Sequence, residues 1–488
     1  MKHVPRGRFA EVLEPLLAQH PEQSGVLPLI KAREAFAARV LLARQAQFSL
    51  DVQYYIWRND RTGTLLFEAL HEAAERGVHV RLLLDDHSTA GLDATLIGLQ
   101  SHPNIEVRLY NPLRLRRPRF INYLVDFKRV NRRMHNKAFI ADQQVLISGG
   151  RNIGDEYFAA HDDLVFADLD ALMVGPVVAE ANHEFSAYWN SALAVPLAKL
   201  FTLTKPQSLA KLERRASVIE SDPQAKKYVD AVRNMPFVQN FMTRQIEFVW
   251  AQVHLVVDDP KKTLGLANQK QHLVYQLQQA IGSPQQCVRL VSPYFVPTAE
   301  GTRQLCELAQ QGVAITILTN SLEATDVAVV HAGYAKWRKV LLRAGIEIYE
   351  VQKVSPLARK QERKLRRQRL KGKERFGGSA SSLHAKTFSV DKQRVFLGSF
   401  NFDPRSLQLN TELGFVIHSN LLAEQIDHAF INTVPNYAYR VGIDDNDNLY
   451  WEERLGPRVT RYASEPGVSW WRRLGMLTLA KLPIDWLL

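Results

Sequence analysis

Two segments of the chain repeat one pattern of histidine, lysine and aspartate, H-x-K-x4-D, at a separation of 249 positions. An asparagine follows each histidine at the same offset of 17 residues. The eight residues are His135, Lys137, Asp142 and Asn152 in the first copy and His384, Lys386, Asp391 and Asn401 in the second. A shared asparagine offset in two copies of a rare pattern indicates a duplicated functional site rather than coincidence.

These residue types suit chemistry at a phosphodiester. A histidine with an ordinary pKa of about 6.5 can attack phosphorus when neutral and donate a proton when charged. Lysine ammonium groups and asparagine amides can hold the phosphate oxygens without a metal. The sequence therefore predicts a metal-free and cofactor-free site in which one histidine is the nucleophile and the other is the general acid and base.

The repeat extends to the elements that must position the motifs. Residues 74–85 and 309–320 both read as a helix, a glycine stop and an apolar strand. Residues 50–57 and 288–295 match as a preceding strand. Strands that alternate with helical segments predict an α/β fold in each half. We expect the motifs themselves to lie on strands, because residues two apart then project from one face.

The length of 488 residues predicts two main domains with a connecting region. We place the first domain at residues 1–185, a mostly helical connection at 186–282 and the second domain at 283–488. Neither half holds two motif histidines by itself. The halves are therefore expected to be α/β sandwiches that bring one histidine each to a shared site across a pseudo-twofold axis. A metal role for Asp258 and Asp259, in a turn before the second half, is a weaker possibility.

On these motifs, and on segments such as 149–158, 326–334 and 398–406, the chain resembles the phospholipase D superfamily. Within it, the chain is most similar to bacterial cardiolipin synthases of the C type. The resemblance implies that His135 is the nucleophile and His384 the general acid and base, although the two roles could be exchanged. It also aligns Asp168, 33 residues after His135, and Glu412, 28 residues after His384, each as the carboxylate partner of the histidine in its own copy.

Three further expectations concern individual residues. Asp142 and Asp391 end their strands and are expected to fix local structure more than to touch substrate. Gly149-Gly150 stands where the second copy has Gly398-Ser399, so a serine role in phosphate binding is not expected in the first half. Contact with the acceptor headgroup is expected from a helix-like segment after residue 320, where helix packing is the alternative for Trp337. Its candidate residues are Asp326, His331 and Tyr334.

Charge and tail composition favour a membrane partner. The net charge is +12, and residues 359–375 contain ten Lys or Arg and two Glu. Such a block attracts anionic lipid or nucleic acid, or is simply a solvated loop. The end of the chain, with Trp470, Trp471 and a leucine-rich tail, suits a bilayer interface or docking on the protein core. No run of 18 apolar residues is present, and Cys287 and Cys306 give no disulfide framework.

Three activities use such a site. The resemblance implies a phosphatidyltransferase that makes cardiolipin from phosphatidylglycerol and a second phospholipid, either phosphatidylglycerol or phosphatidylethanolamine. A hydrolytic phospholipase D would use the same residues with water as acceptor. A nuclease is disfavoured because such members often carry one motif and dimerise, so nucleic acid is not an expected partner. We expect a peripheral protein on the cytoplasmic face of the bacterial inner membrane, with phospholipid substrates and an anionic membrane surface as partners. The sequence identifies no protein partner.

Overall fold

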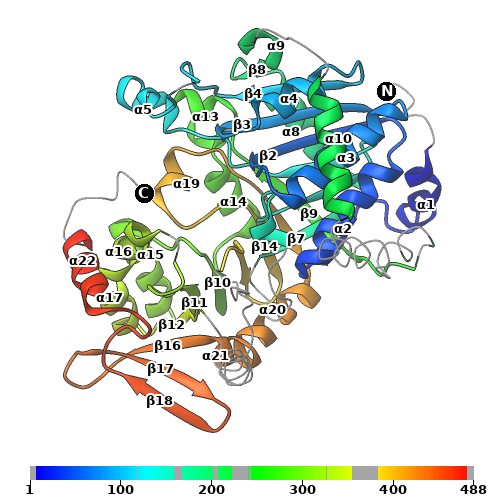
Figure 1. Cartoon of the computed structure of the whole chain (residues 1–488). Coiled ribbons are helices and arrows are strands. Elements are labelled where there is room, and N and C mark those ends of the chain that lie inside the picture. Colours follow the sequence, from blue (N-terminus) through cyan, green and yellow to red (C-terminus); the bar gives the residue numbers. More distant parts are fainter. Residues whose placement is uncertain are drawn as a thin grey trace, which may run out of the picture.

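The computed structural model describes residues 7–116, 118–158, 168–201, 207–221, 240, 243, 245–325, 327–353 and 383–480. Its two halves lie one above the other in Figure 1, with the first half at the top. The strands of the first half are β1 (Ser24–Leu29), β2 (Ser49–Ile56), β3 (His79–Ser88), β4 (Ile105–Tyr110), β5 (Ala138–Ala141), β6 (Val145–Gly149), β7 (Asp170–Val174) and β8 (Ala194–Pro196). Those that follow are β9 (Val249–Val257), β10 (Cys287–Val291), β11 (Ala314–Asn320), β12 (Glu347–Val351), β13 (Thr387–Val390), β14 (Arg394–Gly398), β15 (Leu413–His418), β16 (Ala438–Ile443), β17 (Leu449–Leu455) and β18 (Arg458–Tyr462).

The strand order repeats between the halves. In the first half the neighbours run β8-β4-β3-β2-β5-β6-β7-β1. In the second they run β9-β15-β14-β13-β10-β11-β12-β16-β17-β18. The trios β2-β3-β4 and β10-β11-β12 are parallel, and the remaining pairs are antiparallel. The predicted duplicated α/β fold is therefore confirmed.

Helices connect and cover these strands. Those of the first half are α1 (Arg8–Leu17), α2 (Ala32–Gln45), α3 (Arg61–Glu75), α4 (Asp93–Gln100), α5 (Ile121–Val125), α6 (Phe127–Val130), α7 (Asp155–Phe158), α8 (Pro176–Trp189), α9 (Leu197–Leu200) and α10 (Gln207–Ser221). Those that follow are α13 (Lys261–Leu264), α14 (Leu273–Ile281), α15 (Thr298–Gln310), α16 (Ala328–Ala335), α17 (Arg338–Arg343), α19 (Pro404–Gln408), α20 (Asn420–Asn432), α21 (Val434–Tyr437) and α22 (Trp470–Ala480). The expected glycine stops follow α3 and α15, where Gly77 and Gly312 take φ values of 93° and 94°.

Three apolar cores hold the layers together. One packs α2 and α3 on the sheet of the first half, and another packs α14 and α17 on the sheet of the second. The third lies between the halves and joins Ile140 and Met173 of the first sheet to Leu397 and Phe415 of the second. Because side chains of both sheets share this core, the two halves are fixed relative to each other at the level of their motif strands.

One expectation about elements requires correction, and two strands were not expected. The connection 186–282, predicted to be mostly helical, also contributes β8 and β9. Residues of β9 pair with β1 on one side and with β15 on the other, so this strand joins the two sheets. The motif histidines and lysines also precede their strands, since β5 begins at Ala138 and β13 at Thr387. Before β5 the backbone pairs with the opposite half, through Met134 and Thr411.

Candidate active site

The two motif segments meet where a loop of the second half crosses the start of the first motif. The backbone N–H of His135 donates to the carbonyl of Thr411 at 2.8 Å, and the N–H of Thr411 donates to Arg133 at 2.9 Å. Met134 and Thr411 accordingly form a parallel bridge. This backbone pairing places Glu412, the residue after Thr411, beside the first motif histidine.

Each motif histidine is held by a carboxylate of the opposite half. His135 Nδ1 lies 2.8 Å from Glu412 Oε2, and His384 Nδ1 lies 2.7 Å from Asp168 Oδ2. The order of these residues along the chain suggested pairing within each half, and the structure shows that this is wrong. A bond from Nδ1 to a carboxylate fixes the ring and leaves Nε2 available for chemistry. The crossing also brings both histidines, and both pairs, into one site.

A chain of buried groups holds the Glu412 carboxylate. The hydroxyl of Ser399 donates to Glu412 Oε2 at 2.5 Å, and the N–H of Leu413 donates to Ser399 Oγ at 3.0 Å. The backbone N–H of Glu412 donates to Asp258 Oδ2, which Lys262 also contacts at 2.8 Å. Asp258 therefore supports the position of Glu412, a role that does not need the metal considered from the sequence.

The position in the first half that corresponds to Ser399 is Gly150, and it must be a glycine. A Cβ atom on Gly150 would lie 2.1 Å from Asp168 Oδ1. In the second half, Ser399 fills the matching position and donates a hydrogen bond to Glu412. The difference between Gly149-Gly150 and Gly398-Ser399 thus reflects how each carboxylate is seated: one packs against a bare backbone and the other accepts from a hydroxyl.

Two buried lysines supply positive charge beside the histidines. Lys137 Nζ donates to the carbonyl of His135 at 2.6 Å, and Lys386 Nζ donates to the carbonyl of His384. Burial lowers the pKa of Lys137 to about 7, against the opposing charge of Glu412. A bound phosphate anion would favour the charged form of this lysine, so the site is suited to take up an anion.

Protonation differs between the two histidines. Burial, followed by the charges of Lys137 and Lys386, lowers the pKa of His135 well below its ordinary value. Burial and the charge of Lys386 also lower the pKa of His384, but Asp168 opposes this shift by charge and hydrogen bond.

The pKa values of the two partner carboxylates, Glu412 and Asp168, are shifted in opposite directions. Burial raises the pKa of Glu412 to about 7. Burial alone would raise the pKa of Asp168 as well, but the charge of His384 and its hydrogen bond hold it below its usual range. The pKa is lowered for both histidines, more strongly for His135, and only His384 has an anionic partner that favours its imidazolium form.

The motif asparagines are both buried. Asn152 Oδ1 accepts from the N–H of Ile56 at 3.1 Å, and its amide donates to the hydroxyl of Tyr157 at 3.2 Å. Asn401 is 4% exposed, and its side-chain oxygen has no hydrogen-bond partner among the described residues. Phosphate binding by the amide of either asparagine stays a prediction.

The motif aspartates take the local structural role expected for them. Asp142 accepts from the N–H groups of residues 47, 48 and 49 at 2.7–2.9 Å. Asp391 accepts in the same way from residues 285, 286 and 287. Both occupy the first of two positive-φ positions in a tight hairpin turn, with φ values of 49° and 54°. Each aspartate therefore ties its motif hairpin to the start of the neighbouring antiparallel strand, β2 in the first half and β10 in the second.

Sequence reasoning missed three aromatic residues at the site. Tyr55 lies edge-on to His135 with ring centroids 5.0 Å apart, and Tyr157 lies edge-on to His384 at 5.2 Å. His87 stacks on Tyr55 at 6.0 Å with nearly parallel rings. The matched segments place Pro293 opposite Tyr55 in the repeat. A search for repeated residues could not find a side chain that only one half carries.

Two of the residues expected to contact the acceptor are buried within the second half. His331 and Tyr334 are 2% and 1% exposed. The imidazole bonds to Glu465 at 3.1 Å, and the Tyr334 hydroxyl donates to Glu350 at 3.0 Å. These contacts pack α16 within the second half and do not support substrate binding by either side chain. Asp326 lies outside the described residues.

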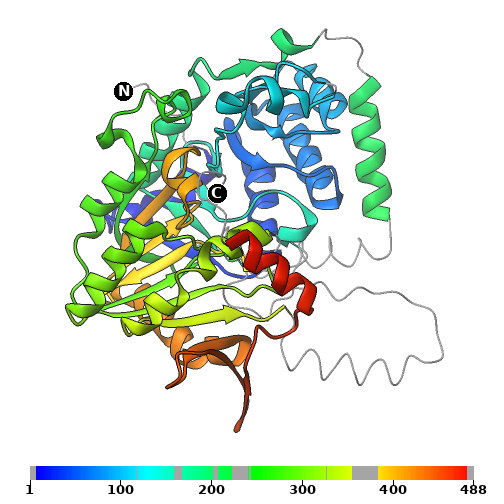
Figure 2. The same cartoon turned by 90° about the vertical axis from the view of Figure 1, so that its left-hand side faces the viewer.

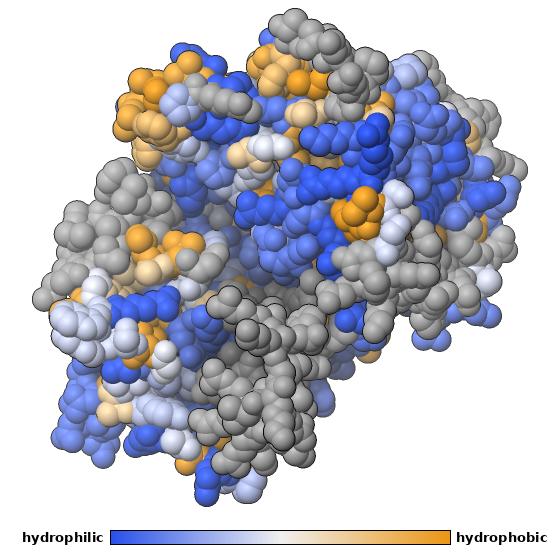
Figure 3. Space-filling model, viewed as in Figure 1, coloured by the Kyte–Doolittle hydropathy of each residue, from blue (hydrophilic) through white to orange (hydrophobic). Residues whose placement is uncertain are grey.

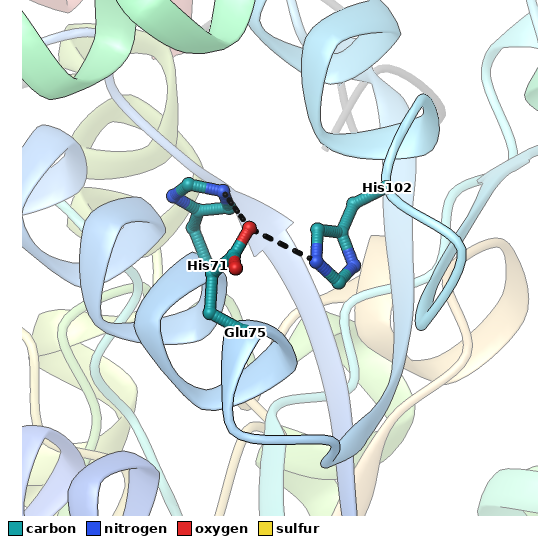
Figure 4. Close-up of side chains that lie close together, drawn as sticks. All are labelled: His71, Glu75 and His102. Atoms are coloured by element: carbon teal, nitrogen blue, oxygen red, sulfur yellow. Dashed lines mark ion pairs between the residues drawn. The ribbon is translucent and has the colours of Figure 1, made fainter.

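One group of side chains in the described part of the chain has ligand types that could hold a metal (Figure 4). Glu75 Oε1 lies 3.5 Å from His71 Nε2 and 3.2 Å from His102 Nε2. His102 Nδ1, however, accepts the N–H of Asn104 at 3.1 Å. The neutral ring then carries its proton on Nε2, which faces Glu75 and leaves no lone pair for a cation. The group is accounted for as a polar cluster between α3 and the loop before β4.

Comparisons with known proteins identify similar chains. A family model described as "Cardiolipin synthase, PLD-like domain" matches residues 41–189 and 277–434. Cardiolipin synthase C of Escherichia coli (strain K12) is 45% identical over 481 residues, which cover 99% of this chain and 100% of the relative. Cardiolipin synthase A of Pseudomonas putida (strain GB-1) is 23% identical and covers 89% of this chain and 74% of the relative.

A solved structure shares the fold. The crystal structure of phosphatidylserine synthase from Haemophilus influenzae Rd KW20 matches with a TM-score of 0.55 at 14% identity. The match covers 89% of this chain and 92% of that chain. The two-half architecture therefore extends to a protein of very different sequence.

Proposed function

Because this chain belongs to the cardiolipin synthase family of phospholipase D-like proteins, we propose that it is a phosphatidyltransferase that makes cardiolipin. Phosphatidylglycerol is one substrate, and phosphatidylglycerol or phosphatidylethanolamine is the other. The observation that carries the proposal is the pair of histidines with crossed carboxylate partners beside two buried lysines. This set provides a nucleophile, a proton carrier and the charge that a phosphodiester needs.

In the first step, His135 Nε2 attacks the phosphorus of the donor phospholipid. A nitrogen–phosphorus bond forms while the bond from phosphorus to the headgroup oxygen breaks, and His384 gives its proton to that oxygen. Lys137 and Lys386 neutralise the phosphate oxygens during the attack. The neutral state of His135 and the anionic partner of His384 support this division of roles.

In the second step, the hydroxyl of an acceptor phosphatidylglycerol enters on the side that the headgroup has left. His384 removes its proton, the oxygen bonds to phosphorus, and the nitrogen–phosphorus bond breaks to regenerate His135. The products are cardiolipin and glycerol or ethanolamine, according to the donor. Water in place of the acceptor would give phosphatidic acid, so hydrolysis uses the same machinery.

The test is product analysis of the purified chain. It is incubated with phosphatidylglycerol alone, with phosphatidylglycerol and phosphatidylethanolamine, and separately with DNA, and the products are resolved by mass. We expect cardiolipin as the main lipid product and intact DNA. Phosphatidic acid without cardiolipin would replace the transferase by a phospholipase, and cleaved DNA would indicate a nuclease. An isotope-labelled ethanolamine headgroup released with cardiolipin would identify phosphatidylethanolamine as donor.

We further propose that the protein is peripheral on the cytoplasmic face of the bacterial inner membrane. No helix among the described residues is long and apolar enough to cross a bilayer. α22 packs on α16 through Met476, which is 5% exposed, and leaves Trp470, Trp471 and Leu474 at 58%, 66% and 50% exposure. Tryptophans beside arginines favour the headgroup region of a bilayer. The basic block 359–375 and the tail after residue 480 lie outside the described residues.

A further inference from the structure

A second apolar surface projects from the first half around α5. Its large side chains are exposed to an unusual degree: Phe120 is 64%, Leu124 76% and Val125 72% exposed, with Leu115 and Phe127 at 44% and 38%. Figure 3 shows an apolar area at the upper left, at the position of α5 in Figure 1. Contiguous apolar groups left in water mark a surface that another phase or molecule covers.

The inner side of this segment is firmly held. Asn122 is 1% exposed, and its side chain accepts from the N–H of Leu115 at 3.0 Å and donates to the Leu115 carbonyl at 2.7 Å. Arg116 and Arg119 form ion pairs with Asp86 and Asp93. The polar groups thus face the protein, and the fold itself presents the apolar side chains outward.

Charge identifies what this surface fits. Residues 113–133 contain eight Lys or Arg and a single acidic residue, Asp126. The Arg114 side chain is 78% exposed, and Lys128 is exposed beside the apolar group. Apolar side chains beside the exposed cations Arg114 and Lys128 match an anionic phospholipid surface. They do not match a second copy of the same basic surface, because like charges would meet.

The same segment reaches the active site. The Tyr123 hydroxyl of α5 is hydrogen-bonded to His87 Nδ1. His87 stacks on Tyr55, whose ring lies against His135. α5 and α22 both lie on the left-hand side of the molecule in Figure 1, the side that faces the viewer in Figure 2. A largely hydrophilic recess lies below the apolar area at α5 in Figure 3.

We propose that the α5 arm, residues 115–127, inserts into the interface of an anionic phospholipid bilayer as the first-half counterpart of α22. The two arms then seat the mouth of the site on the membrane, so that substrate headgroups enter without leaving the lipid surface. The inference rests on the proposed function, because insertion into the bilayer brings the site to its substrates only if these are lipids. The docking itself can be measured without any turnover.

The test compares two double variants of the full chain. One is Leu124→Ser with Val125→Ser on α5, and the control is Leu421→Ser with Ile431→Ser on α20, where the exposures are 54% and 59%. Sedimentation with vesicles of phosphatidylglycerol and phosphatidylethanolamine should weaken about tenfold for the α5 variant and remain unchanged for the control. Turnover of vesicle lipid should fall in parallel, whereas turnover of detergent-dispersed lipid should stay within about twofold of wild type.

A fluorescence measurement on a different variant tests the proposal even if the α5 double variant folds poorly. Val125→Cys in a Cys306→Ser background is labelled with a polarity-sensitive fluorophore, and its emission should shift to the blue with anionic vesicles. The same label at Leu421→Cys should not respond. An unresponsive label at position 125, or wild-type vesicle affinity in the α5 variant, overturns the proposal. Self-association lost in the variant without a change in vesicle affinity would identify a second copy as the occupant. Wild-type protein that binds vesicles but makes no cardiolipin in any format would instead refute the proposed function.

Discussion

The crossed pairing predicts that Asp168→Asn impairs the histidine of the other half. Asp168 contacts His384, so the amide should remove the anion that stabilises a protonated His384. A hydrogen bond between charged groups contributes about 1.5–3 kcal/mol, and one pKa unit corresponds to about 1.36 kcal/mol. The pKa of His384 should therefore fall by about one to two units, and transfer at neutral pH should fall about 10–100-fold.

The sign of the pH effect follows from the role of the proton. His384 donates in the first step, so its protonated form is required and activity declines as pH rises through its pKa. Asp168→Asn lowers that pKa and should move the alkaline limb of the first step to lower pH. Glu412→Gln is the matched control, because it makes the same chemical change beside His135.

The assay separates the two histidines by leaving group. A phosphatidyl ester of p-nitrophenol departs as a stable anion and does not need the proton of His384. Asp168→Asn and His384→Ala should therefore keep a stoichiometric burst of p-nitrophenolate and lose turnover. Glu412→Gln should reduce the burst, and His135→Ala should abolish it. A burst that Asp168→Asn abolishes and Glu412→Gln preserves would refute the crossed assignment.

The remaining predictions address the supports of the site and the membrane. Gly150→Ala should reduce transfer about as much as Asp168→Asn, because its Cβ would displace the carboxylate, whereas Gly301→Ala, with 3.7 Å of clearance, should be active in the same assay. Asp391→Asn should lower the free energy of unfolding by about 1.5–3 kcal/mol in urea titrations. Because hydrogen bonds oppose burial and hold the Asp391 pKa down, this loss should shrink as pH falls through that pKa. EDTA should leave transfer unchanged, and inhibition reversed by one divalent ion would contradict the metal-free mechanism. Truncation before Ser469 should weaken sedimentation with anionic vesicles but spare detergent-dispersed turnover, and a loss of folding without a change in affinity would make α22 a core element only.

The repeat made much of the fold readable from the sequence. The parallel trios and the glycine stops follow from a pattern that occurs twice, and so does the role of Asp142 and Asp391 in their turns. β9 was missed although its residues are rich in β-branched types, because it lies in the part of the chain without a motif. Linear spacing also gives no information on how two sheets stack, so the exchange of carboxylates between the halves could not be predicted.

Site residues that occur in only one half could not be recognised from the sequence either. Asp85 and Asn320 hold equivalent places, since each accepts from the residue before a motif histidine, at 2.9 and 3.0 Å. Two positions further on, the first half has the exposed His87 and the second has the buried Leu322. In the sequence alone, this difference resembles neutral divergence of a repeat. Only the stacking of His87 on Tyr55, whose ring lies against His135, shows that His87 borders the site.

The crossing also explains why neither copy of the motif can be lost. An imidazole without its carboxylate has neither a fixed orientation nor a stabilised charge, and each carboxylate here belongs to the other half. Loss of one half therefore disables the histidines of both halves. Loss of the first half, for example, removes His135 and also removes Asp168, the partner of His384. Asp258 extends this dependence, because it holds Glu412 from the end of the strand that joins the two sheets. The unit on which selection acts is thus the pair of halves, which accounts for two intact motifs in one chain.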